Sequence, residues 1–243
     1  MGRLALTELK LFARERVGPV VAVGMPLALL VVFGNLPFYK TPRDTFGGLT
    51  LLDVYVPVLS AFVLATLSFN VMPGVLAGYR ESGVLRRMRT TPVGPARVLA
   101  AQLLVTLATA AVSVAAVLLV ARLAFGVPLP RRLGGYVVAI VLTALALVAI
   151  GLFVAAASPN GRVANAVGAA LFYVMMATAG LFFPIDAMPP VLRRISRAAP
   201  LGAAVQALGD ATRGHWPHAA QLLVLAAYAV VFGAGAVRLF RWE

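Results

Sequence analysis

The chain has 243 residues, of which 61% are hydrophobic and 12% are charged, with 21 Lys and Arg against 8 Asp and Glu. Soluble domains carry about 25% charged residues, so this composition excludes an ordinary soluble protein, and we expect one membrane domain over residues 1–243. The net charge of +13 does not indicate a nucleic-acid-binding protein, because the Arg residues are spread over loops and both ends. The absence of Cys excludes disulfides, thiolate metal sites and cysteine nucleophiles.

The first 36 residues predict a surface helix followed by a membrane span. Residues 3–16 mix Leu and Phe with acidic and basic residues, which favours an amphipathic interfacial helix on the cytoplasmic leaflet. A solvated basic terminus that only sets orientation is the alternative. The first span is predicted at residues 17–36. Its apolar stretch is longer than the core of a signal peptide and no small-residue cleavage site follows, so we expect it to remain uncleaved.

The second span, predicted at residues 54–79, is longer than the hydrocarbon core of a bilayer requires. Pro57 and Pro73 interrupt its helical hydrogen bonds. It also contains four polar residues: Ser60, Thr66, Ser68 and Asn70. A helix of this kind requires protein or water beside it. Near its end, Gly74 and Gly78 form a GxxxG pattern that permits close helix packing.

Residues 80–97 form a short basic interruption between two apolar stretches and contain five of the 21 Lys and Arg. The positive-inside rule places such a loop in the cytoplasm. Leu85 and Met88 are three residues apart, which predicts a short amphipathic helix that Pro92 and Pro95 would end. The alternative is a basic loop that only fixes topology and contacts lipid phosphates.

The remaining spans are predicted at residues 98–121, 136–157, 163–183 and 219–237, with a tight turn at residues 158–162. An outer segment, residues 184–201, separates the fifth span from the sixth. One face of its predicted helix carries Val191, Leu192, Ile195 and Ala198, and the other carries Arg193, Arg194 and Arg197. That distribution is typical of a helix at the membrane surface. The expected fold is therefore an all-α polytopic membrane protein with six transmembrane helices and both termini in the cytoplasm.

Several kinds of chemistry are missing from the sequence. Neither Lys10 nor Lys40 lies in a Gly-x-x-x-x-Gly-Lys-Ser/Thr motif, so we expect no phosphate-binding P-loop and no ATPase activity in this chain. The six predicted spans carry no Asp, Glu, Lys or Arg away from their ends, which disfavours an ion-coupled carrier. No acidic or thiolate partner is expected near His215 and His218, so a solvated outer loop is favoured over a metal site. We expect no catalytic, cofactor-binding or metal-binding residue.

Two stretches resemble the type-2 ABC transporter permeases, the membrane subunits of bacterial ABC exporters. Similarity to the family's cytoplasmic coupling segment lies in the run Arg80-Glu81-Ser82-Gly83, Leu85-Arg86-Arg87-Met88-Arg89 and Thr91-Pro92. Similarity to its outer segment lies in Gly180-Leu-Phe-Phe-Pro184, Ala187-Met-Pro189, Leu192, Ile195 and Pro200-Leu201. The two stretches occur in the family's order, so the resemblance covers nearly the whole chain. Tyr79 is a departure, because many members carry a charged residue there.

The resemblance implies a permease of the bacterial plasma membrane that pairs with a second permease, identical or different, and with two copies of a separate ATPase subunit. ATP and Mg would bind to that partner, and this chain would contact lipid, bind no cofactor and bind no nucleic acid. Coupling to the ATPase would involve Glu81, Gly83, Arg86 and Arg89. The substrate cleft would be lined by spans two and five, with Phe62, Phe69, Asn70, Phe172, Tyr173 and Met176 as candidates. Ordinary bundle packing is the alternative for the residues of the fifth span.

The function expected from these features is the export of an amphipathic or lipophilic compound such as a drug, an antibiotic or a lipid. Apolar walls with a few polar groups suit such a cargo. Export of a polysaccharide or another polymer is the nearest alternative within the family. An ion-coupled carrier or channel and a membrane enzyme are the alternatives from other classes.

Overall fold

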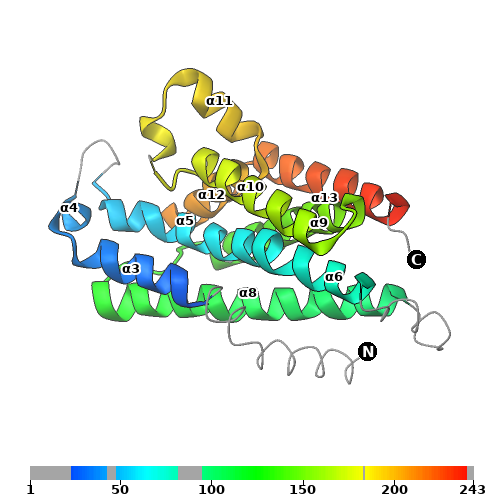
Figure 1. Cartoon of the computed structure of the whole chain (residues 1–243). Helices are drawn as coiled ribbons and strands as arrows, with labels where there is room; N and C mark the ends of the chain where they lie inside the picture. Colours follow the sequence, from blue (N-terminus) through cyan, green and yellow to red (C-terminus); the bar gives the residue numbers. More distant parts are fainter. Residues whose placement is uncertain (1–22, 43–47, 82–94, 183, 240–243) are drawn as a thin grey trace.

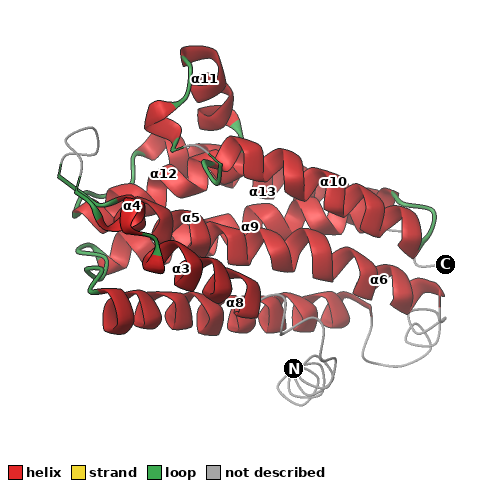
Figure 2. Ribbon diagram, turned by 60° about the vertical axis from the view of Figure 1, so that its left-hand side comes forward, coloured by secondary structure: helices red, strands yellow, loops and turns green. Residues whose placement is uncertain are grey.

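The computed structural model describes residues 23–42, 48–81, 95–182 and 184–239. In these residues the regular structure is helical, apart from one isolated antiparallel bridge between Pro42 and Thr50. Long helices run side by side and form an elongated bundle (Figures 1 and 2). The all-α class is therefore confirmed for the part of the chain that the structure describes.

A central helix made of three segments organises the bundle. α5 (Leu51–Ala65) continues through the π-helical η3 (Thr66–Val71) into α6 (Met72–Glu81). Thr50 begins this helix with a capping box, in which Thr50 and Asp53 each accept a hydrogen bond from the backbone N–H of the other. Every residue from Tyr55 to Phe69 is buried. The expectation that this polar span has protein or water beside it is therefore confirmed, with protein as the neighbour from Tyr55 to Phe69.

Two of its polar side chains have partners inside the bundle. Ser60 Oγ donates to the Val56 carbonyl at 3.0 Å and accepts a hydrogen bond from Tyr136 Oη at 2.7 Å. Thr66 Oγ1 donates to the Phe62 carbonyl one turn earlier, at 2.9 Å. Because a buried hydroxyl is costly without a partner, the bond from Tyr136 fixes the position of the central helix against a neighbouring helix.

The bundle also contains α3 (Met25–Asn35), α8 (Pro95–Phe125), α9 (Leu133–Ala157), α10 (Gly161–Ala179) and α13 (Ala219–Leu239). α3 and α8 contact each other and α5. α9 contacts α6, α10 and α13. Figure 1 accordingly shows α3 and α8 along one side of the central helix and α10 and α13 along the other.

Within the described residues, five helices are long and apolar enough to cross a membrane: Leu51–Leu76, Leu103–Phe125, Leu133–Ala157, Gly161–Ala179 and Ala219–Leu239. They coincide with the second to sixth predicted spans. α3 has 11 residues and is not among them. Part of the first predicted span, residues 17–22, lies outside the described residues, as do the N-terminal amphipathic segment and residues 82–94 of the basic segment. The six-span arrangement therefore stays a prediction.

Several predicted boundaries change. α8 begins at Pro95 and α9 at Leu133, each three residues earlier than predicted. α10 ends at Ala179, so the prediction that the fifth span extends to residue 183 is wrong. The physical reason is Gly180, whose φ of 91° places it in the left-handed region that commonly ends helices.

The region between α10 and α13 contains η4 (Ile185–Ala187), α11 (Pro190–Ala198) and α12 (Pro200–Arg213). A short helix, α11, lies within the predicted outer segment and projects from the bundle in both views (Figures 1 and 2). Its contact with a membrane surface stays a prediction. α12 was not predicted, and most of it is buried. Its small residues, among them Ala203, Ala204 and Ala207, allow α12 to pack closely on α9 and α13.

Candidate functional site

The candidate functional site lies where the central helix ends and the basic segment begins. Glu81 is the last residue of α6, and its exposed side chain reaches the first residue of α10. Glu81 Oε1 accepts a hydrogen bond from the Gly161 backbone N–H at 2.7 Å. Asn160 Oδ1 accepts a second one from the Val163 N–H at 2.9 Å. Two of the four N–H groups that a helix N-terminus leaves unpaired are thus satisfied by side chains.

Electrostatics favours this contact. The N-terminus of a helix carries a partial positive charge, so a carboxylate such as that of Glu81 is stabilised there. Arg162, next in the chain to Gly161, is exposed at the same turn. Of the four residues predicted to couple to an ATPase, only Glu81 is among the described residues. Gly83, Arg86 and Arg89 lie outside them.

Glycines allow α9 and α10 to lie close to the central helix in the interior of the bundle, away from the Glu81–Gly161 contact. A Cβ at Gly168 would collide with the Phe69 carbonyl oxygen, and one at Gly151 would collide with the Ser68 carbonyl oxygen. Farther toward the turn, a Cβ at Gly74 would lie 2.7 Å from Asn165 Oδ1. Side chains at Gly151 and Gly168 would push the helices apart, whereas a side chain at Gly74 would displace the end of the Asn165 side chain. The prediction of close packing at Gly74 is confirmed, whereas a Cβ at Gly78 would meet no heavy atom within 4 Å.

The π-helical η3 explains why backbone carbonyls meet these glycines. Pro73 has no N–H and cannot donate to the Phe69 carbonyl four residues earlier. The chain adopts the wider π pattern instead, in which the Met72 N–H donates to the Leu67 carbonyl. Such a bulge displaces the local carbonyls from the regular helical ladder. We therefore attribute the close approach of α9 and α10 to Pro73 on one side and to the glycines on the other.

The six predicted pathway residues divide into two groups. Four are buried inside this chain: Phe62, Phe69, Phe172 and Met176. The rings of Phe62 and Phe172 meet edge to face, with centroids 5.4 Å apart. Asn70 and Tyr173 are exposed, Tyr173 with 68% of its surface accessible. The structure thus brings the second and fifth predicted spans together, but four of the six side chains fill the interior between them, and their role in a substrate pathway stays a prediction.

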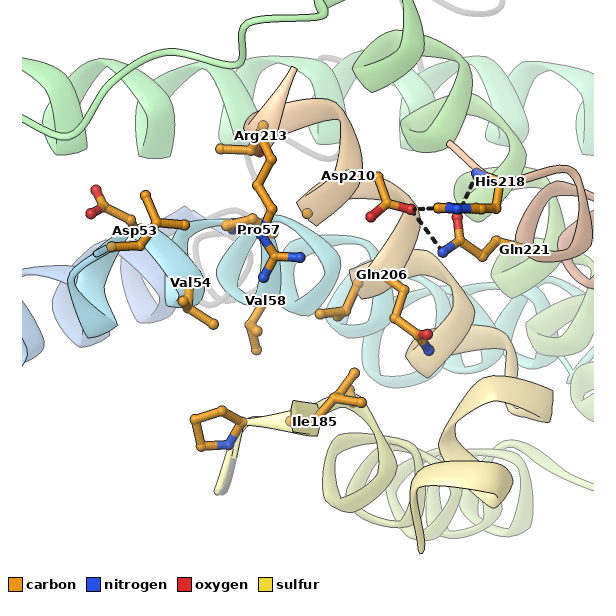
Figure 3. A pocket seen from close by; sticks show the side chains of 17 residues that line it. Asp53, Val54, Pro57, Val58, Ile185, Gln206, Asp210, Arg213, His218 and Gln221 are labelled. Carbon is orange, nitrogen blue, oxygen red and sulfur yellow. Dashed lines mark hydrogen bonds and ion pairs between the residues drawn. The ribbon is translucent and has the colours of Figure 1, made fainter. Parts of the chain in front are cut away.

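A cavity of about 220 Å³ lies at the opposite end of the bundle. Its wall comes from α5, η4, α12 and the beginning of α13, and its polar side chains include Asp53, Gln206, Asp210, Arg213 and His218 (Figure 3). This cavity was not predicted from the sequence. Its residues extend from Leu49 to Gln221 and come from separate elements, so no local pattern joins them.

Asp210 anchors the polar wall of the cavity. Its Oδ2 lies 2.8 Å from His218 Nδ1 and accepts a hydrogen bond from Gln221 Nε2 at 2.9 Å (Figure 3). The expectation that no acidic side chain lies near the two histidines is therefore wrong, because the turn after α12 brings residues 210 and 218 together. Among the described residues, no group of three His, Cys, Asp or Glu side chains could hold a metal ion. The contacts of Asp210 join the end of α12 to the beginning of α13.

Comparison with known families identifies the chain. A family model described as ABC-2 type transporter matches residues 2–211, well over half of the sequence. The chain belongs to the ABC-2 type transporter family. A search of curated proteins finds no match. The matched residues include the central helix, α8, α9, α10 and nearly all of α12, whereas α13 follows them.

Membership in the ABC-2 family confirms the resemblance to type-2 ABC permeases. It identifies the chain as a transmembrane subunit of an ABC transporter, a multi-pass membrane protein that is normally not catalytic itself. Subunits of this family work with an associated ABC ATPase. The end of the bundle that carries Glu81 and the basic segment is thus the candidate site for contact with that partner.

Proposed function

We propose that this chain is the permease subunit of a bacterial ATP-driven exporter, with six membrane spans and both termini in the cytoplasm. The observation that carries the proposal is the match to the ABC-2 type transporter family over residues 2–211. The uncharged interior of the predicted spans supports an external energy source, because ion-coupled carriers generally use an ionisable group near the bilayer midplane. The ATPase subunit supplies that energy by binding ATP and Mg.

Energy coupling is assigned to Glu81, Gly83, Arg86 and Arg89. This assignment is supported by the connection of the basic segment to the central helix, since α6 ends at Glu81. The central helix is the most buried candidate span, so a force applied at its end acts directly on the core of the bundle. Arg86 and Arg89 can form bidentate pairs with carboxylates of the ATPase. The proposed working unit contains two permeases and two ATPase subunits.

The proposed cargo is amphipathic or lipophilic and moves between two permease copies. Asn70 and Tyr173 are exposed on the helices that the family resemblance places at that cleft, so they are the first candidates for contact with cargo. The buried residues Phe62, Phe69, Phe172 and Met176 would line the pathway only after the two helices separate. A tyrosine and an amide beside apolar surface suit a lipophilic compound with a few polar groups.

The proposal is tested with the permease coexpressed with an ABC ATPase subunit and purified without separating the two. Native mass spectrometry should find two copies of each subunit, and ATP hydrolysis in proteoliposomes should be raised by lipophilic fluorescent amines. Arg86→Ala combined with Arg89→Ala should reduce that stimulation. The matched control removes Arg122 and Arg194, two exposed Arg elsewhere on the molecule, and should leave it unchanged. A complex with a single permease and no second one would contradict the assembly.

A further inference from the structure

The hydrogen bond between Glu81 and Gly161 joins two parts of the chain that are 80 residues apart. Glu81 ends the helix that leads into the basic segment, and Gly161 begins α10. Both residues belong to the described part of the chain. A displacement of the end of α6 would therefore act on α10 through this contact.

The central helix and α10 remain in contact along their length beyond the Glu81–Gly161 hydrogen bond. They run antiparallel, and successive contacts pair Glu81 with Gly161, Gly74 with Asn165, and Phe69 with Gly168. Farther along, the ring of Phe62 meets the ring of Phe172. Gly168 leaves no room for a side chain against the Phe69 carbonyl oxygen, and the Asn165 side chain fills the space beside Gly74, so α6, η3 and α10 pack closely along this series. Glu81 is the member of this series nearest to the basic segment.

We propose that Glu81 is a positioning residue that ties the end of the central helix to α10 and passes movement of the ATPase-bound end to α10. This inference rests on the proposed function, since it names how the coupling segment acts on the membrane helices. It also gives Glu81 a partner inside this chain, where the sequence resemblance implied a contact with the ATPase. The helix N-terminus selects a carboxylate, because unpaired N–H groups and a partial positive charge lie there together.

The exposure of Glu81 suits a contact that forms and breaks. Water competes for an exposed carboxylate, so the bond contributes modestly and is exchanged readily. A buried carboxylate would hold the two helices in one arrangement. An exposed one at a helix N-terminus can restore the contact in each cycle of ATP hydrolysis.

A substitution at the donor, Gly161, tests the contact without changing Glu81. Gly161→Pro removes the backbone N–H that donates the hydrogen bond to Glu81. Proline is favoured at the first position of a helix, which Gly161 occupies. The residue before a proline must be extended, and Asn160 already is, with φ −152° and ψ 169°. Gly161→Ala is the matched control, since it keeps the N–H. Glu81→Gln removes the charge from the acceptor side.

Movement of α10 is followed with a fluorophore at one engineered cysteine. The sequence contains no Cys, and Val174 on α10 is 62% exposed, so Val174→Cys gives a single labelled site. The labelled permease is reconstituted with its ATPase in proteoliposomes. ATPase binding and the fluorescence change on adding ATP with Mg are then measured for each variant. The binding measurement detects loss of the ATPase, and the fluorescence change detects whether movement still reaches α10.

Gly161→Pro and Glu81→Gln are expected to bind the ATPase as the parent does. Their ATP-driven fluorescence change should be smaller by roughly two- to tenfold, which is the scale of one weakened hydrogen bond. Gly161→Ala should keep the full change, and the double variant should be no worse than either single one. Full transmission in Gly161→Pro together with a defect in Glu81→Gln would overturn the inference, because Glu81 would then act on the ATPase alone. That result would leave the proposed function standing. Failure of the parent permease to bind any ATPase would overturn both.

Discussion

The two ends of the bundle each use a carboxylate to join two helices, and the difference between them lies in burial. At one end, exposed Glu81 makes a single hydrogen bond to the start of α10. At the other end, Asp210 has a side chain that is only 15% exposed and contacts both His218 and Gln221. A shielded carboxylate with two partners holds its helices firmly, whereas an exposed one with a single partner is weakened by water. The comparison suggests a fixed end around the cavity and an adjustable end beside the basic segment.

The largest expected effect on stability comes from a substitution in the buried core between the two ends of the bundle. Phe69 is fully buried in the central helix, so Phe69→Ala should lower the free energy of unfolding by about 3–5 kcal/mol. Tyr173→Ala, at an exposed position, should change it by less than about 0.5 kcal/mol. Denaturant unfolding in detergent measures both. Altered cargo preference in Tyr173→Ala at unchanged stability would support a pathway role for that residue, while a stable Phe69→Ala protein would contradict the core assignment.

The next effect concerns the close approach of α10 to the central helix. Gly168→Ala places a methyl group against the Phe69 carbonyl oxygen and should cost about 1–3 kcal/mol of stability. Gly78→Ala is the matched substitution, because its methyl group would meet no heavy atom within 4 Å. Thermal unfolding of the two variants compares them directly. Equal midpoints would mean that the helices separate without strain.

At the cavity end, Asp210→Ala removes the acceptor that joins α12 to α13. We expect a loss of about 1–2 kcal/mol, because Gln221 is left without this partner and His218 loses its contact. Asp210→Asn keeps one oxygen acceptor and should lose less. Both are followed by thermal unfolding of the purified permease. If neither variant is less stable than the parent, the cavity end is not the fixed end of the bundle.

A smaller effect on stability than at Asp210 is expected at the other carboxylate, Glu81. Glu81→Ala should lower the free energy of unfolding by no more than about 1 kcal/mol, because the lost bond is exposed. Membrane insertion should be intact, yet cargo-stimulated ATP hydrolysis and transport should fall together, and Gly83→Leu should act in the same way. Hydrolysis by the reconstituted complex with and without a lipophilic amine measures this. Normal stimulation in both variants would mean that the basic segment only sets topology.

The sequence alone carried enough information for the helical class, for most of the spans and for the family. Apolar stretches of about 20 residues have few solutions other than membrane helices, because every backbone polar group must be satisfied within the segment. The polar residues Ser60 and Thr66 correctly indicated a helix with protein or water beside it, and both are buried in the bundle. The alternation of apolar and basic residues predicted α11 for a similar local reason. Such signals depend on neighbours within one helix.

Only the tertiary structure decided which helices meet. The bond from Glu81 to Gly161, the collision that Gly168 avoids at Phe69, and the pairing of Asp210 with His218 each depend on how separate helices pack. Helical periodicity predicts which residues share a face, but it does not say which helix covers that face. The packing of the central helix against α10 places the rings of Phe62 and Phe172 in contact inside the bundle. The family resemblance had assigned these two residues to a cleft, and that role stays a prediction. The buried helix α12 was missed for the same reason, because its small residues become an interior surface only when α9 and α13 lie beside them.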